Sequence, residues 1–338
     1  MPLSLKSEIR ADDIADIDAL KPCKVFLLRG KHNDDLIIKN EGPGMGQKRP
    51  ISNSAMKAVD KNARMRQLSL PELEAIQAFA EAYQDYYQIL FGKPWRPKTD
   101  QAAEQLKKEF SKYGLNPSEW FKMDKLQLRN LDSTLRIVSD NERDSALSNF
   151  GRALSRNGGL GKLGEIVAAD AIIGNTDRFT PWGRVPSYKG NYLESSGQFQ
   201  WNIALKCVQN AGNIFVAMDP ETGTFRPSGV DYLDPSNSFD KFEPMDADQQ
   251  ARWPAQVLLK KETRLQYAKD VASDLERLLN PRNRIRLSPA LGFHAAAQIE
   301  AGMISGAKKI YGKFADKYNS KPMPEGVKQR LVLLNDIV

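Results

Sequence analysis

The sequence predicts an α+β, bilobal fold, with a small mixed lobe followed by a larger, mainly helical lobe. Two apolar, β-branched runs lie close together near the amino terminus, at roughly 23–29 and 35–40. Apolar residues at helical spacing recur through much of the remaining chain and dominate it from about residue 260 onward, after an irregular stretch at 220–255. We place the boundary between the lobes near residue 124, so the predicted domains are 1–124 and 125–338.

The first lobe is predicted to begin with a short acidic helix over residues 12–20. The two apolar runs then form a hairpin, because a short polar turn separates them. A loop rich in Gly, Pro and Ser follows, and a helix is expected after it. Another helix begins at Ser69, whose hydroxyl caps a first turn that contains Pro71. These two helices are predicted at 54–67 and at about 69–90. A third helix is predicted from Lys98, and a strand at 120–126.

The second lobe is predicted to contain several helices and one hairpin. The first helix ends at the sequence Asn157-Gly158-Gly159, a typical carboxyl-terminal stop. A Walker-type phosphate loop is not supported there, because Arg156 and Leu163 occupy positions that require Gly and Ser or Thr. The predicted elements are helices at 142–156, 163–173, about 260–279, 290–319 and 324–336, and a hairpin of strands 201–208 and 213–219.

Composition limits the chemistry that this chain of 338 residues can perform. It has two cysteines, Cys23 and Cys207, and two histidines, His32 and His294. We expect free thiols rather than a disulfide, and zinc or Cys–His sites are poorly supported. Carboxylates, amides and lysines must therefore carry any catalysis.

Charge and hydropathy address location and partners. The net charge of +7 is dispersed over 49 Lys and Arg against 42 Asp and Glu, and no nucleic-acid-binding signature occurs. Nucleic acid is therefore an unlikely partner. No apolar run approaches the ~20 residues that cross a bilayer. The charged amino terminus lacks a signal-peptide core, so we expect a cytoplasmic protein, or one secreted into a host cell by a signal-peptide-independent route.

An acid on an apolar helical stripe is the first candidate functional residue. Asp170 shares the buried face of helix 163–173, so its carboxylate needs partners. The backbone or Arg178 of the following loop can supply them. That loop, with the sequence IIGNTDRF, also presents Asp177, which can accept or orient a hydroxyl proton.

The predicted hairpin supplies candidate metal ligands. Asn202 opens its first strand and Asp219 ends its second, so the hairpin brings the two side chains together. Amide and carboxylate oxygens are the ligands that Mg²⁺ prefers. Lys39 ends an early strand and can contact nucleotide phosphates. A lysine, a carboxylate near the nucleophile and metal ligands are the parts that phosphoryl transfer from ATP requires.

These segments resemble the catalytic core of actin-fragmin kinase-like proteins. The resemblance rests on LGEIVAADAIIGNTDRF, followed by GNYLESSGQFQWNIAL and FVAMD. More distantly, the segments are similar to HipA-type and phosphatidylinositol 3/4-kinase-like enzymes. The resemblance covers residues 161–219, with a weaker match at 23–39. It implies a protein-kinase-like fold with Asp177 as catalytic base, Asn202 and Asp219 as metal ligands, and Lys39 on the nucleotide.

Several alternatives stay open. Asp231 or Asp234 is a rival of Asp219 for the metal, and Phe179 stands where HipA-type sequences usually carry His. The carboxylate partner of Lys39 is unassigned among Asp60, Glu72, Glu74 and Glu81.

The resemblance implies an ATP- and Mg-dependent Ser/Thr protein kinase, which could be a bacterial effector acting in a host cell. A phosphoinositide or small-molecule kinase is the alternative enzyme. A catalytically silent nucleotide-binding scaffold is the alternative outside enzymes. The phosphate acceptor, the oligomeric state and any activating partner stay open.

Overall fold

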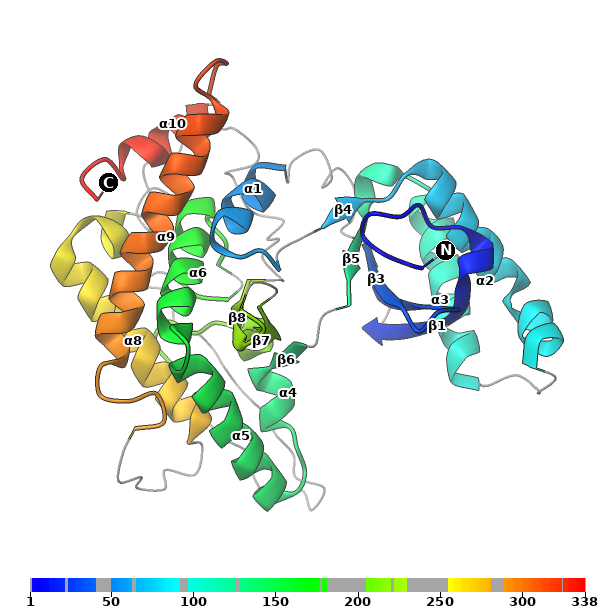
Figure 1. The fold of residues 1–338 in the computed structure, drawn as a ribbon, viewed down its shortest axis with the longest axis horizontal. Helices are drawn as coiled ribbons and strands as arrows, with labels where there is room; N and C mark the ends of the chain where they lie inside the picture. Colours follow the sequence, from blue (N-terminus) through cyan, green and yellow to red (C-terminus); the bar gives the residue numbers. More distant parts are fainter. Residues whose placement is uncertain are drawn as a thin grey trace. The chain divides into compact units, whose positions relative to one another are not determined.

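The computed structural model describes two compact units (Figure 1). Unit 1 contains residues 1–50 and 64–125, and unit 2 contains residues 51–63 and 126–338. Residues 51–63 therefore cluster with the second unit, whereas the sequence placed them in the first lobe. The described residues are 2–21, 24–40, 50–62, 65–91, 97–125, 128–176, 178–180, 205–219, 222–229, 255–280, 289–323 and 325–337.

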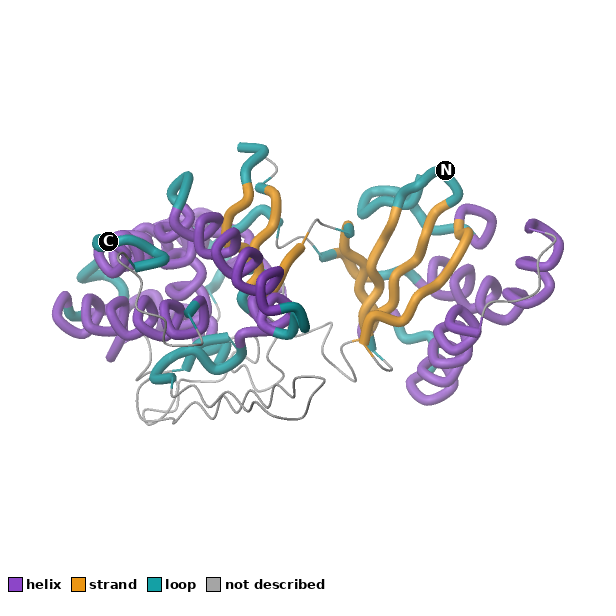
Figure 2. Tube along the Cα trace, turned by 90° about the horizontal axis from the view of Figure 1, so that it is seen from below, coloured by secondary structure: helices purple, strands orange, loops and turns teal. Residues whose placement is uncertain are grey.

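Unit 1 is an antiparallel sheet with two helices packed on one face (Figure 2). Alternate residues of its central strands, such as Phe26 and Ile38, join Ile76 and Phe110 of the helices in one core. Mixed sheet and helix in this unit and the next are compatible with the predicted α+β class. The strands, in sheet order, are β1 (Ile14–Lys21), β2 (Val25–Gly30), β3 (Asp35–Asn40), β5 (Trp120–Asp124) and β4 (Arg66–Gln67), and the helices are α2 (Leu70–Phe91) and α3 (Pro97–Tyr113).

The predicted acidic helix at 12–20 is wrong. A single 3-10 turn, η1 (Ala11–Asp13), leads into β1, which pairs with β2. Ile14 and Ile17 are three residues apart, a spacing that indicated a helix. In the structure the pairing shifts register between Ile14 and Asp16, which lets both isoleucines reach the core.

Other local predictions in unit 1 are confirmed. β2 and β3 form the expected hairpin, and strand 120–126 corresponds to β5. Ser69 caps α2: its hydroxyl accepts a bond from the Glu72 amide at 3.4 Å, and the Glu72 carboxylate accepts one from the Ser69 amide at 2.9 Å. The helix predicted at 54–67 lies mostly in unit 2 and differs from the prediction, because α1 (Pro50–Val59) begins earlier and ends before a turn.

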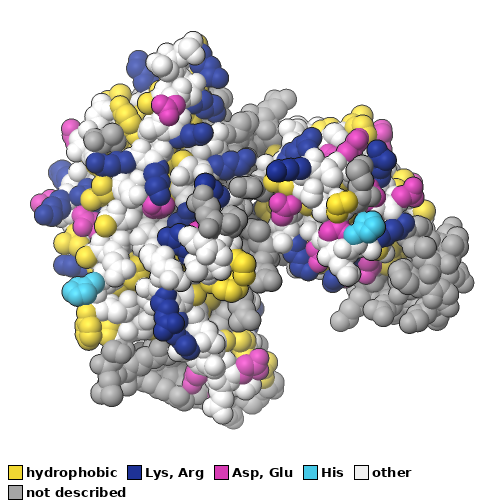
Figure 3. All heavy atoms as spheres, in the orientation of Figure 1, with side chains coloured by type: hydrophobic (Ala, Val, Ile, Leu, Met, Phe, Trp, Pro, Cys, Tyr) yellow, Lys and Arg dark blue, Asp and Glu magenta, His cyan; other side chains and the backbone are white. Residues whose placement is uncertain are grey.

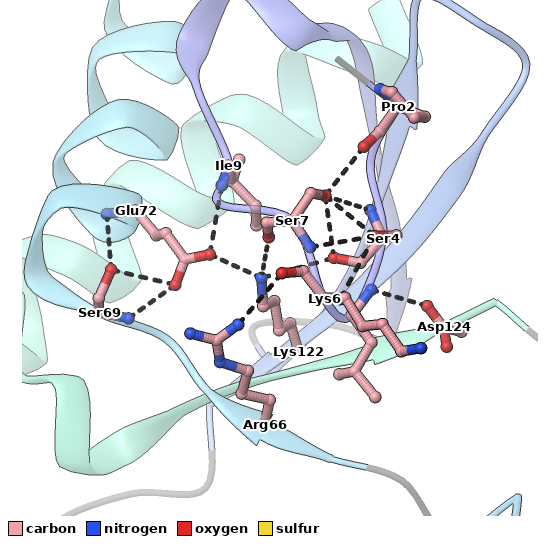
Figure 4. Close-up of polar contacts among 11 residues, drawn as sticks. Pro2, Ser4, Lys6, Ser7, Ile9, Arg66, Ser69, Glu72, Lys122 and Asp124 are labelled. Carbon is pink, nitrogen blue, oxygen red and sulfur yellow. Dashed lines mark hydrogen bonds and ion pairs between the residues drawn. The ribbon is translucent and has the colours of Figure 1, made fainter.

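A buried ion pair anchors the amino terminus to this sheet (Figure 4). Lys122 of β5 is 0% exposed, and its Nζ lies 2.6 Å from Oε1 of Glu72. The same ammonium donates to the carbonyl of Ser7 at 2.5 Å, and Glu72 Oε1 also accepts from the Ile9 amide at 3.2 Å. Both charges are thus compensated inside unit 1 by one another and by backbone groups.

Unit 2 contains a three-stranded antiparallel sheet and most of the helices (Figure 1). Cys207 is buried and free, as expected, whereas Cys23 lies outside the described residues. None of the described helices is long and apolar enough to span a membrane. The strands, in sheet order, are β6 (Leu128–Asn130), β7 (Phe215–Met218) and β8 (Phe225–Ser228), and the helices are α1, α4 (Leu131–Leu135), α5 (Asp140–Ser155), α6 (Gly159–Ile173), α8 (Lys261–Leu279), α9 (Ala295–Lys317) and α10 (Glu325–Val332).

Residues 205–208, the described part of the predicted strand 201–208, do not pair with β7. β7 pairs with β6 on one edge and β8 on the other, so neither edge is left for residues 205–208. Within the described part of that run, the isolated bridge joins Val208 to Phe179 instead. β8 itself was missed, because its sequence FRPS contains proline and lacks apolar alternation.

Helices α6 and α9 pack at very close range through glycines. Gly164 lies against the backbone of Ile299, and Gly306 lies against Glu165. A Cβ added at Gly302 would overlap the carbonyl oxygen of Gly161 and stand 2.9 Å from its Cα. The two backbones can approach this closely because no side chain separates them.

We expect Gly302→Ala to destabilise the protein by about 1–3 kcal/mol, the usual cost of overpacking a core. Gly312→Ala, on the same helix with nothing within 4 Å of the added Cβ, should stabilise by about 0.5–1 kcal/mol through helix propensity. Urea unfolding of both variants measures the two effects. If both substitutions change the free energy of unfolding equally and in the same direction, the close packing at Gly302 is contradicted.

Candidate functional site

The loop that follows α6 is fixed by a buried carboxylate. Asp170 is 0% exposed, and its Oδ2 lies 2.7 Å from Nη1 of Arg178. Its Oδ1 accepts a bond from Nδ2 of Asn175 at 2.9 Å, and its carbonyl accepts one from the Asn175 amide at 2.8 Å. Gly174, with φ at 77°, ends the helix as predicted. The expectation that Asp170 is buried and holds Arg178 is confirmed.

Arg178 connects this loop to the start of β7. Its Nε donates to the carbonyl of Asn213 at 2.6 Å, and its own carbonyl accepts from the Gln209 amide at 3.0 Å. Asn213 ends the short turn η3 (Ala211–Asn213) and is 3% exposed. The guanidinium is 1% exposed, so its charge is balanced within the protein by Asp170.

Two of the four predicted site residues, Asp177 and Asn202, lie outside the described residues. Asn175, two residues before Asp177, and Arg178, directly after it, are both bonded to Asp170. The loop that carries the predicted catalytic base is therefore anchored on each side of it.

Asp219 lies at the closed end of the β7–β8 hairpin. Its Oδ2 is 3.0 Å from Nη1 of Arg226, and its Oδ1 accepts from the Thr222 amide at 3.3 Å. Its backbone amide donates to the Thr224 carbonyl at 2.8 Å, as a turn requires. Residues 205–208 do not pair with β7, so the described residues do not supply the hairpin from which the proximity of Asn202 to Asp219 was predicted.

The open end of the same hairpin carries other oxygen groups. Asn213 precedes β7, and Gly229 follows β8, whose Ser228 pairs with Phe215. The Asp60 carboxylate, at the end of α1, accepts bonds there from Ser228 Oγ at 2.8 Å and from the Gly229 amide at 2.6 Å. An asparagine at the start of an apolar strand was the signal used for Asn202, and it fits Asn213, the first residue of the predicted strand 213–219, equally well.

Lys39 belongs to unit 1, where it lies on β3 opposite Val25 and Phe121. Its side chain is half-buried and shares a face with Ile37, away from the helix-covered core of unit 1. Glu72 is paired with Lys122, and the Asp60 carboxylate binds β8 of unit 2. Two candidate partners of Lys39 therefore have other roles, while Glu74 and Glu81 are exposed.

Groups of three or more His, Cys, Asp or Glu that could hold a metal ion do not occur among the described residues. The rival ligands Asp231 and Asp234 are not among those residues. In Figure 3, Lys and Arg side chains are scattered over the drawn face and do not gather on one element. This matches the dispersed charge of the sequence.

No model of a known protein family matches the chain, and no curated protein matches it. The resemblance to actin-fragmin kinase-like proteins therefore stays a prediction.

Proposed function

We propose that this protein is an ATP- and Mg-dependent kinase that phosphorylates Ser or Thr of a protein substrate. The observation that carries the proposal is the buried network of Asp170, Asn175 and Arg178. It holds Asn175 before Asp177 and Arg178 after it through buried, charge-assisted hydrogen bonds. Catalysis by positioning needs a carboxylate held in one geometry, and this network supplies the anchor.

In this proposal each residue has a distinct task. Asp177 accepts the proton of the acceptor hydroxyl, or orients that hydroxyl, as the oxygen attacks the γ-phosphorus. Lys39 contacts the phosphates of the nucleotide. The protein-kinase-like bilobal architecture belongs to the same proposal, as does action inside a host cell.

For Mg²⁺ we favour the open end of the β7–β8 hairpin over its closed end. The Asp219 carboxylate is already occupied by Arg226, and a cation there would have to displace that guanidinium. Asn213 lies at the open end, and Asp231 follows Gly229 by two residues in the sequence. These are hard oxygen donors, and a magnesium ion held by them would neutralise phosphate charge.

The primary test is incubation of the purified protein with Mg²⁺ and γ-labelled ATP, with and without a eukaryotic cell lysate. The lysate supplies acceptors and any activating factor. We expect Asp177→Asn to lower label transfer roughly 10²–10⁴-fold, the usual contribution of a general base. Asp336→Asn, an exposed acid near the carboxyl terminus, is the control and should behave as wild type. Equal transfer by both variants would refute the role of Asp177.

A second set of variants separates the two metal sites. Asp231→Asn and Asn213→Ala should abolish transfer if the open end holds Mg²⁺, while Asp219→Asn and Asn202→Ala retain it. If instead Asp219→Asn and Asn202→Ala abolish transfer and the other two variants retain it, Asn202 and Asp219 are the metal ligands, as predicted from the sequence.

The labelled product identifies the substrate class. Phosphoserine or phosphothreonine in a labelled band supports a protein kinase, whereas label in lipid or small molecules supports the alternative enzyme. Nucleotide binding without any transfer would favour a silent scaffold. Absence of both binding and transfer would overturn the proposed function.

A further inference from the structure

A buried carboxylate on α8 holds three consecutive backbone amides. Asp274 is 0% exposed, and Oδ2 accepts bonds from the amides of Lys206 at 2.9 Å, Cys207 at 2.7 Å and Val208 at 3.0 Å. Its Oδ1 also accepts from the Lys206 amide at 3.0 Å. Burial raises the pKa of Asp274, although the three amide bonds oppose that shift. An apolar side chain in its place would leave these backbone amides without this acceptor, so the carboxylate fixes the segment as packing alone could not.

The segment that Asp274 holds is itself paired with the loop after Asp177. Val208 forms a bridge with Phe179, and the Thr180 amide donates to the Cys207 carbonyl at 2.8 Å. The Gln209 amide donates to the Arg178 carbonyl at 3.0 Å. Residues 206–209 and 178–180 therefore form one short antiparallel pair.

A second α8 residue holds the other side of this pair. Tyr267 precedes Asp274 by seven residues, two helical turns, so both side chains leave the same face of α8. Its hydroxyl donates to the Thr180 carbonyl at 2.7 Å, and the residue is 0% exposed. Helix α8 therefore binds the backbone of both segments: Asp274 accepts hydrogen bonds from residues 206–208, and Tyr267 donates one to Thr180. We call these bonds the α8 grip.

We propose that Asp274 is a positioning residue for phosphoryl transfer, which acts by holding the backbone of 178–180 through segment 206–208. The inference rests on the proposed function, since residues 178–180 directly follow Asp177. A shift of about 1 Å in a catalytic group can cost roughly 10²-fold in rate. Loosening the α8 grip should therefore change turnover more than nucleotide binding.

The test compares Asp274→Asn with Asp270→Asn in the full chain. Asp270 is one turn earlier on α8 and pairs with Nζ of Lys206, a side chain that is 58% exposed. The control thus removes a charge that contacts the same residue without touching its backbone. We expect Asp274→Asn to lower kcat by about 10–10²-fold with KM for ATP changed less than about threefold, and Asp270→Asn to match wild type. A folded Asp274→Asn with the kcat of the control would overturn the proposal.

Hydrogen exchange gives a readout that does not depend on activity. Amides of 178–180 and 206–208 should exchange faster in Asp274→Asn than in Asp270→Asn. If wild type transfers no phosphate, the proposed function fails, and the positioning role fails with it. Faster exchange in Asp274→Asn than in Asp270→Asn would then still show that Asp274 holds the two segments. Equal exchange rates in the two variants would show that it does not.

Tyr267→Phe covers the case in which Asp274→Asn does not fold. It removes one hydrogen bond to Thr180 and keeps the buried ring. We expect a smaller fall in kcat, about 3–10-fold, with faster exchange confined to residues 178–180. Unchanged kcat and unchanged exchange in this variant would contradict the α8 grip.

Discussion

Asp170→Ala is expected to destabilise the protein by about 3–5 kcal/mol, because it leaves the guanidinium of Arg178 buried without its counter-charge. A typical protein of this kind is stable by only about 5–15 kcal/mol. The variant should therefore be marginal at 37 °C. Urea unfolding followed by circular dichroism measures the change against wild type.

Two further variants show whether the loss arises from burial of the charge. Asp132 and Arg136 on unit 2 form a pair with the same 2.7 Å separation, but the Arg136 side chain is 65% exposed. Arg136→Ala should cost about 1 kcal/mol or less. The double variant Asp170→Ala, Arg178→Met should recover part of the loss. If Asp170→Ala is as stable as Arg136→Ala, the buried charge of Arg178 does not depend on Asp170 for its stabilisation.

Lys122→Met is the second change with a large expected effect, again about 3–5 kcal/mol. It leaves the Glu72 carboxylate buried, with its bonds to Ser69 and Ile9 but without a cation. The free energy of unfolding, measured by urea titration, should fall accordingly. Lys125→Met is the control, since the Lys125 side chain in the Lys125–Asp35 pair is 42% exposed, and loss of the pair should cost about 1 kcal/mol or less.

The pH dependence of this effect has a definite sign. Burial raises the pKa of Glu72, but the bonds from Lys122 and from the backbone outweigh it and leave that pKa below its usual value. The pair therefore stabilises above the unfolded pKa of Glu, about 4.3, and its contribution is lost as the pH falls through the folded-state pKa. Removing Lys122 raises the pKa of Glu72 relative to wild type, because burial is then opposed only by the backbone bonds. The difference in unfolding free energy between wild type and Lys122→Met should therefore narrow as the pH falls, first as Glu72 protonates in the variant and then as it protonates in wild type. A gap that widens with acid would contradict this ion pair.

Features with a local cause could be predicted from the sequence. The β2–β3 hairpin has its turn between its strands, and the Ser69 cap needs only residues within the first turn of α2. Asp170 could be predicted because an acid on an apolar stripe must find a partner close by. In each case the residues that determine the structure lie a few positions apart.

Features with a distant cause could not be predicted in this way. β7 pairs with β6, which precedes it by more than 80 residues and is only three residues long. The bonds of Arg178 to Asn213 and of Asp274 to residues 206–208 end on backbone groups, which every sequence contains. Lys122 lies two residues after Trp120 on β5, so both side chains are on the same face of the strand. The sequence did not indicate that this lysine is buried.

The chain passes from one unit to the other three times, at 50/51, 63/64 and 125/126. Cutting at the last of these points would not yield two intact pieces. A fragment of residues 126–338 would lack α1, and with it the Val59 carbonyl that receives a hydrogen bond from Nζ of Lys162. It would also lack Asp60, which receives bonds from Ser228 and Gly229. Independent expression of unit 2 would therefore require that α1 be fused to the fragment or produced together with it. A series of progressively shortened chains would misjudge where the folding units end.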